Sequence, residues 1–250
     1  MLFSILAGGN MREIIISILL TIPVVLISLS VHESAHGYIA MKLGDPTAYN
    51  LGRVTINPLK HIDPLGALCM LALGYGWAKP VPINARNFKN PKVGMALTAI
   101  AGPVSNIILG VIGAVAAPIT FIVGEIVAGY ITASGLVSST ITLNVLNTII
   151  TFCELFSLMN FMLAAFNLIP VPPFDGSRFV SLFLPTKIYF AIMKYEKFVM
   201  IGVLVGIIVL SRVFNFSPFY EIAKIAFSAV ATPTYYLANQ LFLLILSFVA

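Results

Sequence analysis

Charged side chains are scarce in this sequence. Lys and Arg number 14 and Asp and Glu number 9, so that 9% of the 250 residues are charged, whereas ordinary globular domains contain about 25%. Hydrophobic residues make up 59% of the chain. So few charges cannot cover a water-exposed surface, which excludes a soluble globule, a coiled coil, a disordered chain and a nucleic-acid-binding protein. Most of the chain must therefore face lipid.

A cysteine framework and a removable signal peptide are also missing. The two cysteines, Cys69 and Cys153, lie far apart and neither belongs to a CxxC pair. They predict no disulfide framework and no sulfur metal site, and we expect both to be inert apolar fillers. Residues 1–10 lack a basic flank and a convincing cleavage site, so we expect no cleaved leader.

A bilayer crossing requires about 20 mainly apolar residues, and five apolar segments are candidates, of which residues 199–210 are short but can be extended by Phe198 and Phe214. They are residues 14–31 (apolar to 41 apart from a charged interruption), 93–123, 141–169, 199–210 and 222–250. A further apolar segment, residues 65–78, is too short to cross comfortably. We therefore predict an all-α polytopic membrane protein with about five to six membrane-embedded helices. It forms one domain over residues 1–250, with a core at about 12–197 and C-terminal membrane helices at about 198–250.

The basic residues predict the orientation of these spans. Residues 42–92 contain seven Lys and Arg, residues 178–197 contain four, and only three lie elsewhere. Cytoplasmic loops carry the excess of basic residues, so both segments are predicted to be cytoplasmic and the N-terminus external. This arrangement requires residues 65–78 to form a re-entrant segment. We expect a multi-pass protein of the cell membrane.

Residues 47–56 (TAYNLGRVTI) have a different pattern. They combine β-branched and aromatic residues with partial period-two alternation and a glycine at position 52. Such a pattern indicates a strand or a small β hairpin near the cytoplasmic face of the membrane.

The first apolar run ends in the sequence HESAH. His32 and His36 are spaced i and i+4, so on a helix both imidazoles lie on one face and can bind one zinc ion. Glu33 is offset by one residue, so it cannot join them as a ligand but can reach a metal-bound water. Each ionisable side chain at membrane depth costs several kcal/mol, which disfavours coincidence. The pattern therefore predicts a metal site.

A catalytic zinc usually takes three protein ligands and leaves one position open. His61 and the remaining acids are candidates, and Asp175 stands out because three prolines at 170–173 precede it. These prolines end the third helix, and irregular backbone at membrane depth is tolerated only where it is buried or lines a wet cavity. The alternative is an ordinary helix end, with Asp175 capping the next turn. The predicted topology puts the HESAH sequence and Asp175 on the same side.

These segments resemble the site-2 protease family of intramembrane zinc metalloproteases. The similarity rests on HESAH (32–36), AGPVSN (101–106) and NLIPVPPFDG (167–176), and on HIDPLG (61–66) and GWAKPVPIN (76–84), which are typical of short members without a PDZ domain. The resemblance implies one zinc ion bound by His32, His36 and Asp175. It further implies that Glu33 is the general base and that Asn167 holds the scissile carbonyl or its oxyanion.

The resemblance also implies a substrate class. Transmembrane proteins would be cleaved within or next to their spans, in regulated intramembrane proteolysis at the cytoplasmic side. Because a helix hides its peptide bonds, the substrate must unwind locally, and we hypothesise that residues 47–56 pair with it as an added strand.

Two other functions fit part of the sequence. Intramembrane His, Glu and Asp also mark ion pathways, as in a metal or ion transporter, but no pair of related halves is visible. A zinc-binding scaffold without activity would not need Glu33. Among the remaining residues, His61 either shapes the approach to the site or is a structural histidine. Asn106 either bonds near the site or packs between helices. The sequence does not fix the oligomeric state.

Overall fold

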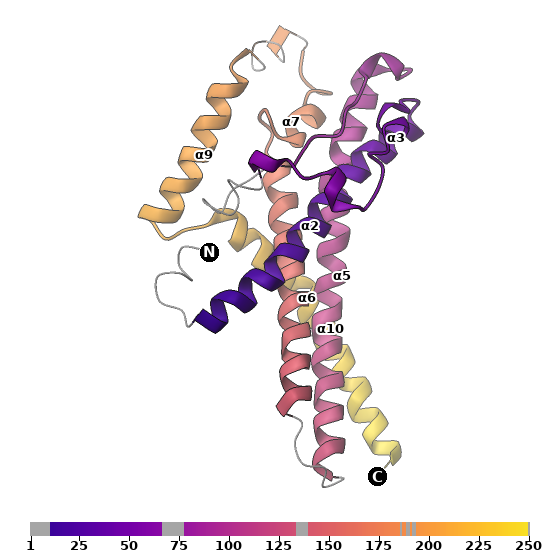
Figure 1. Cartoon of the computed structure of the whole chain (residues 1–250), viewed down its shortest axis with the longest axis vertical. Helices are drawn as coiled ribbons and strands as arrows, with labels where there is room; N and C mark the ends of the chain where they lie inside the picture. Colours follow the sequence, from indigo (N-terminus) through magenta and orange to yellow (C-terminus); the bar gives the residue numbers. More distant parts are fainter. Residues whose placement is uncertain are drawn as a thin grey trace.

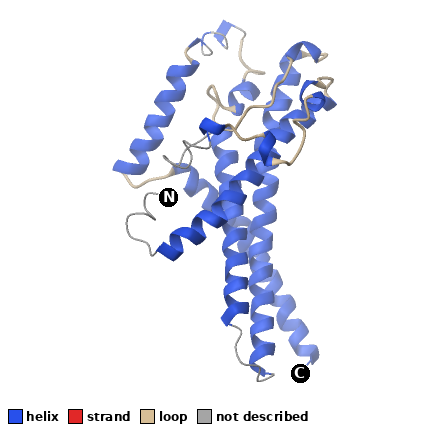
Figure 2. Ribbon diagram, in the orientation of Figure 1, coloured by secondary structure: helices blue, strands red, loops and turns tan. Residues whose placement is uncertain are grey.

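The computed structural model describes residues 11–66, 78–133, 140–185, 187–188, 191 and 194–249 (Figure 1). This part of the chain is helical, with loops and no strand (Figure 2). In lipid, a helix satisfies its own backbone hydrogen bonds, which explains why the apolar runs take this form. The long helices are α2 (Met11–Lys42), α5 (Pro91–Ala133), α6 (Thr140–Asn167), α9 (Glu196–Val213) and α10 (Pro218–Val249). The short ones are α3 (Thr47–Asn50), α7 (Asp175–Val180), η1 (Pro58–Lys60) and η2 (Ala85–Asn87).

Three of the described helices are long and apolar enough to cross a membrane. They are Ile15–Lys42, Pro91–Tyr130 and Leu143–Asn167, which confirms the spans predicted at residues 14–31, 93–123 and 141–169 and makes this a membrane protein. The apolar part of α9, Phe198–Ser211, is shorter. The predicted count of five to six membrane helices is thus not confirmed. Most of the proposed re-entrant segment, together with Cys69, lies outside the described residues.

The prediction of a strand at residues 47–56 is wrong. Thr47–Asn50 is a short helix, and a turn with Gly52 at a φ of +63° follows it. The cause is local: the Asp45 carboxylate accepts a hydrogen bond from the Thr47 N–H at 3.1 Å, a turn-forming contact that outweighs the weak alternation. Within the described residues, the only β pairing is a single antiparallel bridge between Ile62 and Ala78. The hairpin expected from these residues is therefore absent.

Helices α5 and α6 lie side by side, α2 crosses them at mid-height and α10 packs against both (Figure 1). Small residues permit this close approach. A Cβ atom added at Gly110 would lie 2.8 Å from the Phe161 ring, and one at Gly113 would lie 2.8 Å from the Cys153 carbonyl oxygen. Close packing at small residues is the usual way in which membrane helices associate. This pairing fixes α5 and α6 beside the end of α2.

A buried carboxylate fastens the loops to the end of α2. Asp45 accepts hydrogen bonds from the Asn84 N–H and the Asn87 side-chain amide, both at 2.7 Å, as well as from Thr47. Burial would raise the pKa of Asp45, but the hydrogen bonds from Thr47, Asn84 and Asn87 outweigh it and hold the pKa below its usual range. The folded protein therefore favours the ionised carboxylate.

This contact predicts an acid-sensitive contribution to stability. Because the folded-state pKa of Asp45 is depressed, its contribution is complete above the unfolded pKa of about 4 and is lost as the pH falls through the folded value. Asp45→Asn turns an amide toward these donors, and we expect it to lower the unfolding free energy at pH 7 by about 1–3 kcal/mol. In thermal unfolding in detergent micelles, the difference in melting temperature between the wild type and Asp45→Asn should shrink as the pH is lowered from 7 to 3. A constant difference in melting temperature would contradict this role.

Candidate metal centre

Three potential ligands from two helices converge at one point. His32 and His36 lie on α2, with side chains 6% and 8% exposed, and Asp175 is the first residue of α7. The two imidazole Nε2 atoms are 3.1 Å apart, and Asp175 Oδ2 lies 3.2 Å from each of them. Among the described residues, these three form the one group of histidine, cysteine and acidic side chains arranged to hold a metal ion. The i, i+4 geometry predicted for the histidines is thus present.

The end of α6 directs Asp175 to this point. After Asn167 the chain leaves the helix, and α7 begins only at Asp175. Gly176 permits the compact turn, because a Cβ atom there would lie 2.3 Å from the Leu168 carbonyl oxygen. Phe174 is buried against Phe166, with ring centroids 4.6 Å apart. Asp175 therefore points inward, and the alternative of a simple interfacial helix end does not describe it.

Hydrogen bonds on the far side of each imidazole prepare the Nε2 atoms for a metal. His36 Nδ1 lies 2.8 Å from the Thr98 carbonyl oxygen, and His32 Nδ1 lies 2.6 Å from Asn106 Oδ1. A carbonyl can only accept, so both Nδ1 atoms donate to these oxygens, and both rings are held with Nε2 toward Asp175. Such outer partners are typical of histidine ligands. Asn106, whose role the sequence left open, contacts the site directly.

The geometry and the charge of the group both fit zinc. In a tetrahedral site with ligand distances of about 2.0–2.1 Å, the ligand atoms lie about 3.3 Å apart, close to the spacing found here. Burial would raise the pKa of Asp175, but hydrogen bonds and charge from His32 and His36 lower it below its usual range. The carboxylate is therefore ionised, as a ligand must be.

Glu33 is held beside this group but outside it. Its Oε2 accepts a hydrogen bond from the Val81 N–H at 2.9 Å. Val81 belongs to the loop that leads to α5, and its side chain is buried. One carboxylate oxygen is thus held by a backbone N–H, whereas the other forms no hydrogen bond within the described residues.

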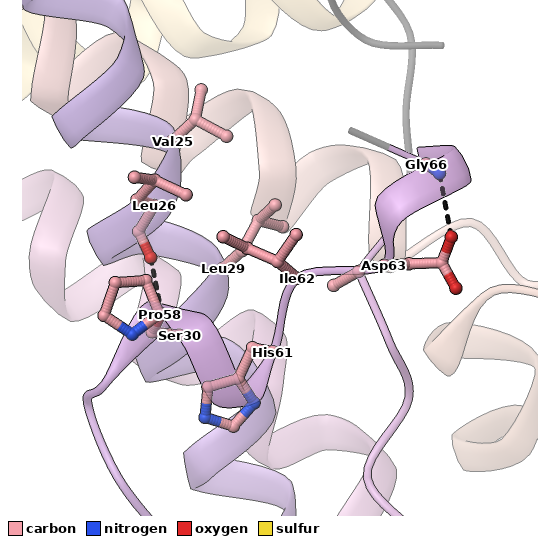
Figure 3. Close-up of a pocket in the computed structure, with 10 residues that line it drawn as sticks. Val25, Leu26, Leu29, Ser30, Pro58, His61, Ile62, Asp63 and Gly66 are labelled. Carbon is pink, nitrogen blue, oxygen red and sulfur yellow. Dashed lines mark hydrogen bonds between the residues drawn. The ribbon is translucent and has the colours of Figure 1, made fainter. Parts of the chain in front are cut away.

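Asn167 and His61, which the sequence also suggested for the site, do not belong to the group of three potential ligands. Asn167 donates a hydrogen bond from its side-chain amide to the Leu163 carbonyl at 3.0 Å. His61 is buried and its Nε2 lies 2.7 Å from the Thr55 carbonyl oxygen, so it is not part of the metal group. It lines a separate, mainly apolar cavity of about 50 Å³ beside Leu29 (Figure 3).

Helix α5 can pass over the two histidines only because position 102 is glycine. A Cβ atom there would lie 2.5 Å from both His32 Cε1 and His36 Nε2, closer than real Cβ contacts allow. The sequence places Gly102 beside Pro103 in AGPVSN, but the contact with the imidazoles depends on how α5 is rotated. The glycine is therefore part of the wall of the site.

Gly102→Ala should disturb the candidate metal centre although residue 102 is not one of the potential ligands. We expect the added methyl group to displace the imidazoles or α5, to lower the unfolding free energy by about 1–3 kcal/mol, and to weaken metal binding. Zinc content after purification and thermal unfolding measure these effects. Gly129→Ala is the matched control on the same helix, because within the described part of the chain no atom beyond the adjoining helix backbone lies within 4 Å of a Cβ there. Equal zinc content in both variants would show that the contact is unimportant.

Comparison with known proteins gives two matches over this region. The sequence pattern of Peptidase family M50 matches residues 20–213. A protein of Bacillus subtilis (strain 168) named "Putative zinc metalloprotease YwhC" is 37% identical over 174 residues, which cover 69% of this chain and 73% of that protein. No solved structure matches the chain significantly. The family match includes both sequence segments that supply the three potential ligands.

Proposed function

The chain belongs to peptidase family M50, and from this premise we propose that it is an intramembrane zinc endopeptidase with one zinc ion per chain. Its substrates are transmembrane proteins, whose peptide bonds it hydrolyses within or next to their spans, in regulated intramembrane proteolysis. The observation that carries the proposal is the convergence of His32 Nε2, His36 Nε2 and Asp175 Oδ2 within 3.2 Å of one another. His32 and His36 lie in the C-terminal half of a helix long enough to cross a membrane, and Asp175 follows the C-terminal end of another.

The residues divide the chemistry between them. His32, His36 and Asp175 would hold the zinc ion, which when bound supplies a water of lowered pKa and polarises the scissile carbonyl. Glu33 accepts a proton from the attacking water and later donates it to the leaving amine. The Val81 N–H orients the Glu33 carboxylate at 2.9 Å, so that its other oxygen is available for proton transfer.

Asn167 is proposed to contact the substrate carbonyl or its oxyanion. Its amide lies at the end of α6, eight residues before Asp175, and now donates to the Leu163 carbonyl. An amide donor has a second N–H, and it can stabilise negative charge that develops on a carbonyl oxygen. The role therefore requires a substrate to approach the exposed end of α6.

We further propose a multi-pass arrangement with the active site toward the cytoplasm. The two segments rich in Lys and Arg, residues 42–92 and 178–197, adjoin the C-terminal end of α2, the N-terminal end of α5, and α7, which follows the C-terminal end of α6. The candidate ligands lie on α2 and α7. In Figure 1 these ends lie together with α3 and α7. The positive-inside rule favours a cytoplasmic location for such segments. The catalytic core then comprises about residues 12–197, and the remaining helices contact the lipid bilayer.

Reconstitution in liposomes tests the proposed function. Zinc-loaded wild-type protein should cleave a model single-span substrate that contains helix-breaking residues, and a zinc chelator should stop the cleavage. Zinc flux without cleavage would favour a transporter. Zinc binding without cleavage of any substrate or flux would favour a scaffold. Either of these results would overturn the proposal.

A further inference from the structure

A chain of buried hydrogen bonds leads from His32 away from the candidate metal centre. Asn106 accepts from His32 Nδ1 at 2.6 Å and donates to Asn160 Oδ1 at 2.8 Å and, over a longer distance of 3.4 Å, to the Ser28 carbonyl. Asn160 in turn donates to Ser28 Oγ at 2.9 Å. Ser28, Asn106 and Asn160 are each 0% exposed, and they lie on α2, α5 and α6 respectively. Because all three side chains are hydrogen-bonded, the network is tolerated in an apolar helix bundle and holds its members in one arrangement.

The two histidines differ in how their outer nitrogen is held. His36 Nδ1 faces a backbone carbonyl, that of Thr98, which can only accept. His32 Nδ1 faces a side-chain amide, whose oxygen and nitrogen exchange places when the group rotates by half a turn. With its NH₂ group toward His32, Asn106 would require Nδ1 to accept. An imidazole that binds a metal through Nε2 carries its proton on Nδ1 and needs an acceptor there, which the rotated amide could not supply.

Backbone carbonyls at the far end of the network prevent this rotation. Asn160 Nδ2 donates to the Phe156 carbonyl at 2.8 Å as well as to Ser28 Oγ. The Ser28 hydroxyl donates its own proton to the Val24 carbonyl at 2.7 Å, so its oxygen can only accept from Asn160. The amide nitrogen of Asn160 must therefore face these two acceptors, and its oxygen must face Asn106.

We propose that Asn160 is a positioning residue for the metal centre. Together with the longer contact to the Ser28 carbonyl, it fixes the amide nitrogen of Asn106 toward α6 and α2, so that the Asn106 oxygen faces His32. That oxygen accepts from His32 Nδ1 at 2.6 Å and holds the ring with Nε2 toward Asp175. The inference rests on the proposed function as a zinc peptidase, but it concerns a residue that touches neither the metal nor the substrate.

Zinc affinity of Asn160 variants tests the proposal without an activity assay. Asn160→Leu has a similar size but cannot bond to Asn106, and we expect its zinc affinity to fall about 10–100-fold, as for other outer partners of histidine ligands. Asn160→Asp should be buried in its neutral form, with an oxygen toward Asn106 and an O–H toward one of the two acceptors, and should recover most of the affinity. The measurement is competition with a chromophoric chelator in detergent micelles.

Ser157→Ala is the matched control. Ser157 lies one turn earlier on α6, is 0% exposed and donates to the Gly110 carbonyl at 2.6 Å. Ser157 therefore links α6 to α5 without belonging to the network. The zinc affinity of the Ser157→Ala variant should stay within about twofold of wild type. Unchanged affinity in folded Asn160→Leu, or equal losses in both variants, would overturn the positioning role. A wild-type protein that binds no zinc would instead refute the proposed function.

A second variant does not depend on whether the leucine side chain fits. Asn160→Ala also removes the hydrogen bond to Asn106, and we expect a similar loss of zinc affinity. A zinc affinity of folded Asn160→Ala within about twofold of wild type would overturn the proposal.

Discussion

Glu33→Gln should reduce peptide cleavage by about 10²–10⁴-fold and leave the zinc content at one ion per chain. Glutamine has the same shape and retains an oxygen for the Val81 N–H, which now bonds to Glu33 at 2.9 Å. It cannot accept a proton from the attacking water. The loss should therefore appear in kcat, measured with a model transmembrane substrate in liposomes, rather than in metal content or thermal stability.

Glu154→Gln is the control for the Glu33 variant. Glu154 is an exposed acid on α6 to which we assign no role, so the same chemical change there should leave kcat unaltered. Normal cleavage by Glu33→Gln would show that Glu33 is not the general base. Loss of zinc from that variant would instead indicate that Glu33 is a ligand.

Asp175→Ala should lower zinc affinity by more than about 100-fold, beyond the effect of losing an outer hydrogen-bond partner. Asp175 Oδ2 lies 3.2 Å from both histidine nitrogens and is the oxygen donor of the group. Without it, two imidazoles remain, which is fewer than the three protein ligands usual for a catalytic zinc. Chelator competition measures the affinity, and cleavage should disappear with the metal.

Asp63→Ala is the control for this second change. Asp63 accepts a hydrogen bond from the Gly66 N–H at 2.8 Å and, like Asp175, follows a helical segment at the candidate cytoplasmic side. Zinc affinity should be retained in this variant. If Asp63→Ala lost the metal and Asp175→Ala kept it, the third ligand would have been assigned wrongly.

The three membrane-crossing helices and the shared face of the two histidines could be predicted from local sequence patterns. Long apolar runs with few charges leave a helix as the available form in lipid, and α2, α5 and α6 follow the predicted segments closely. The spacing of His32 and His36 predicted a shared face because helical periodicity is local. Asp175 was a weaker inference, since the sequence shows where α6 ends but not where the chain turns afterwards.

Other features depend on contacts that no local pattern encodes. The strand expected at residues 47–56 failed because Asp45 starts a turn there, and an alternation of side chains does not register that contact. Thr98, Gly102 and Asn160 face the site only through the rotation of α5 and α6 relative to α2. In a membrane helix, apolar residues surround the axis on every side, so periodicity gives little indication of which face is buried.

X-ray absorption at the zinc edge of the purified wild-type protein tests the central claim most directly, namely that His32, His36 and Asp175 hold one zinc ion. The account predicts about four nitrogen and oxygen ligands at about 2.0–2.2 Å, with the multiple-scattering signature of two imidazoles. A sulfur ligand at about 2.3 Å would place the metal on a cysteine. A third imidazole would bring in His61, and either result would contradict the assignment.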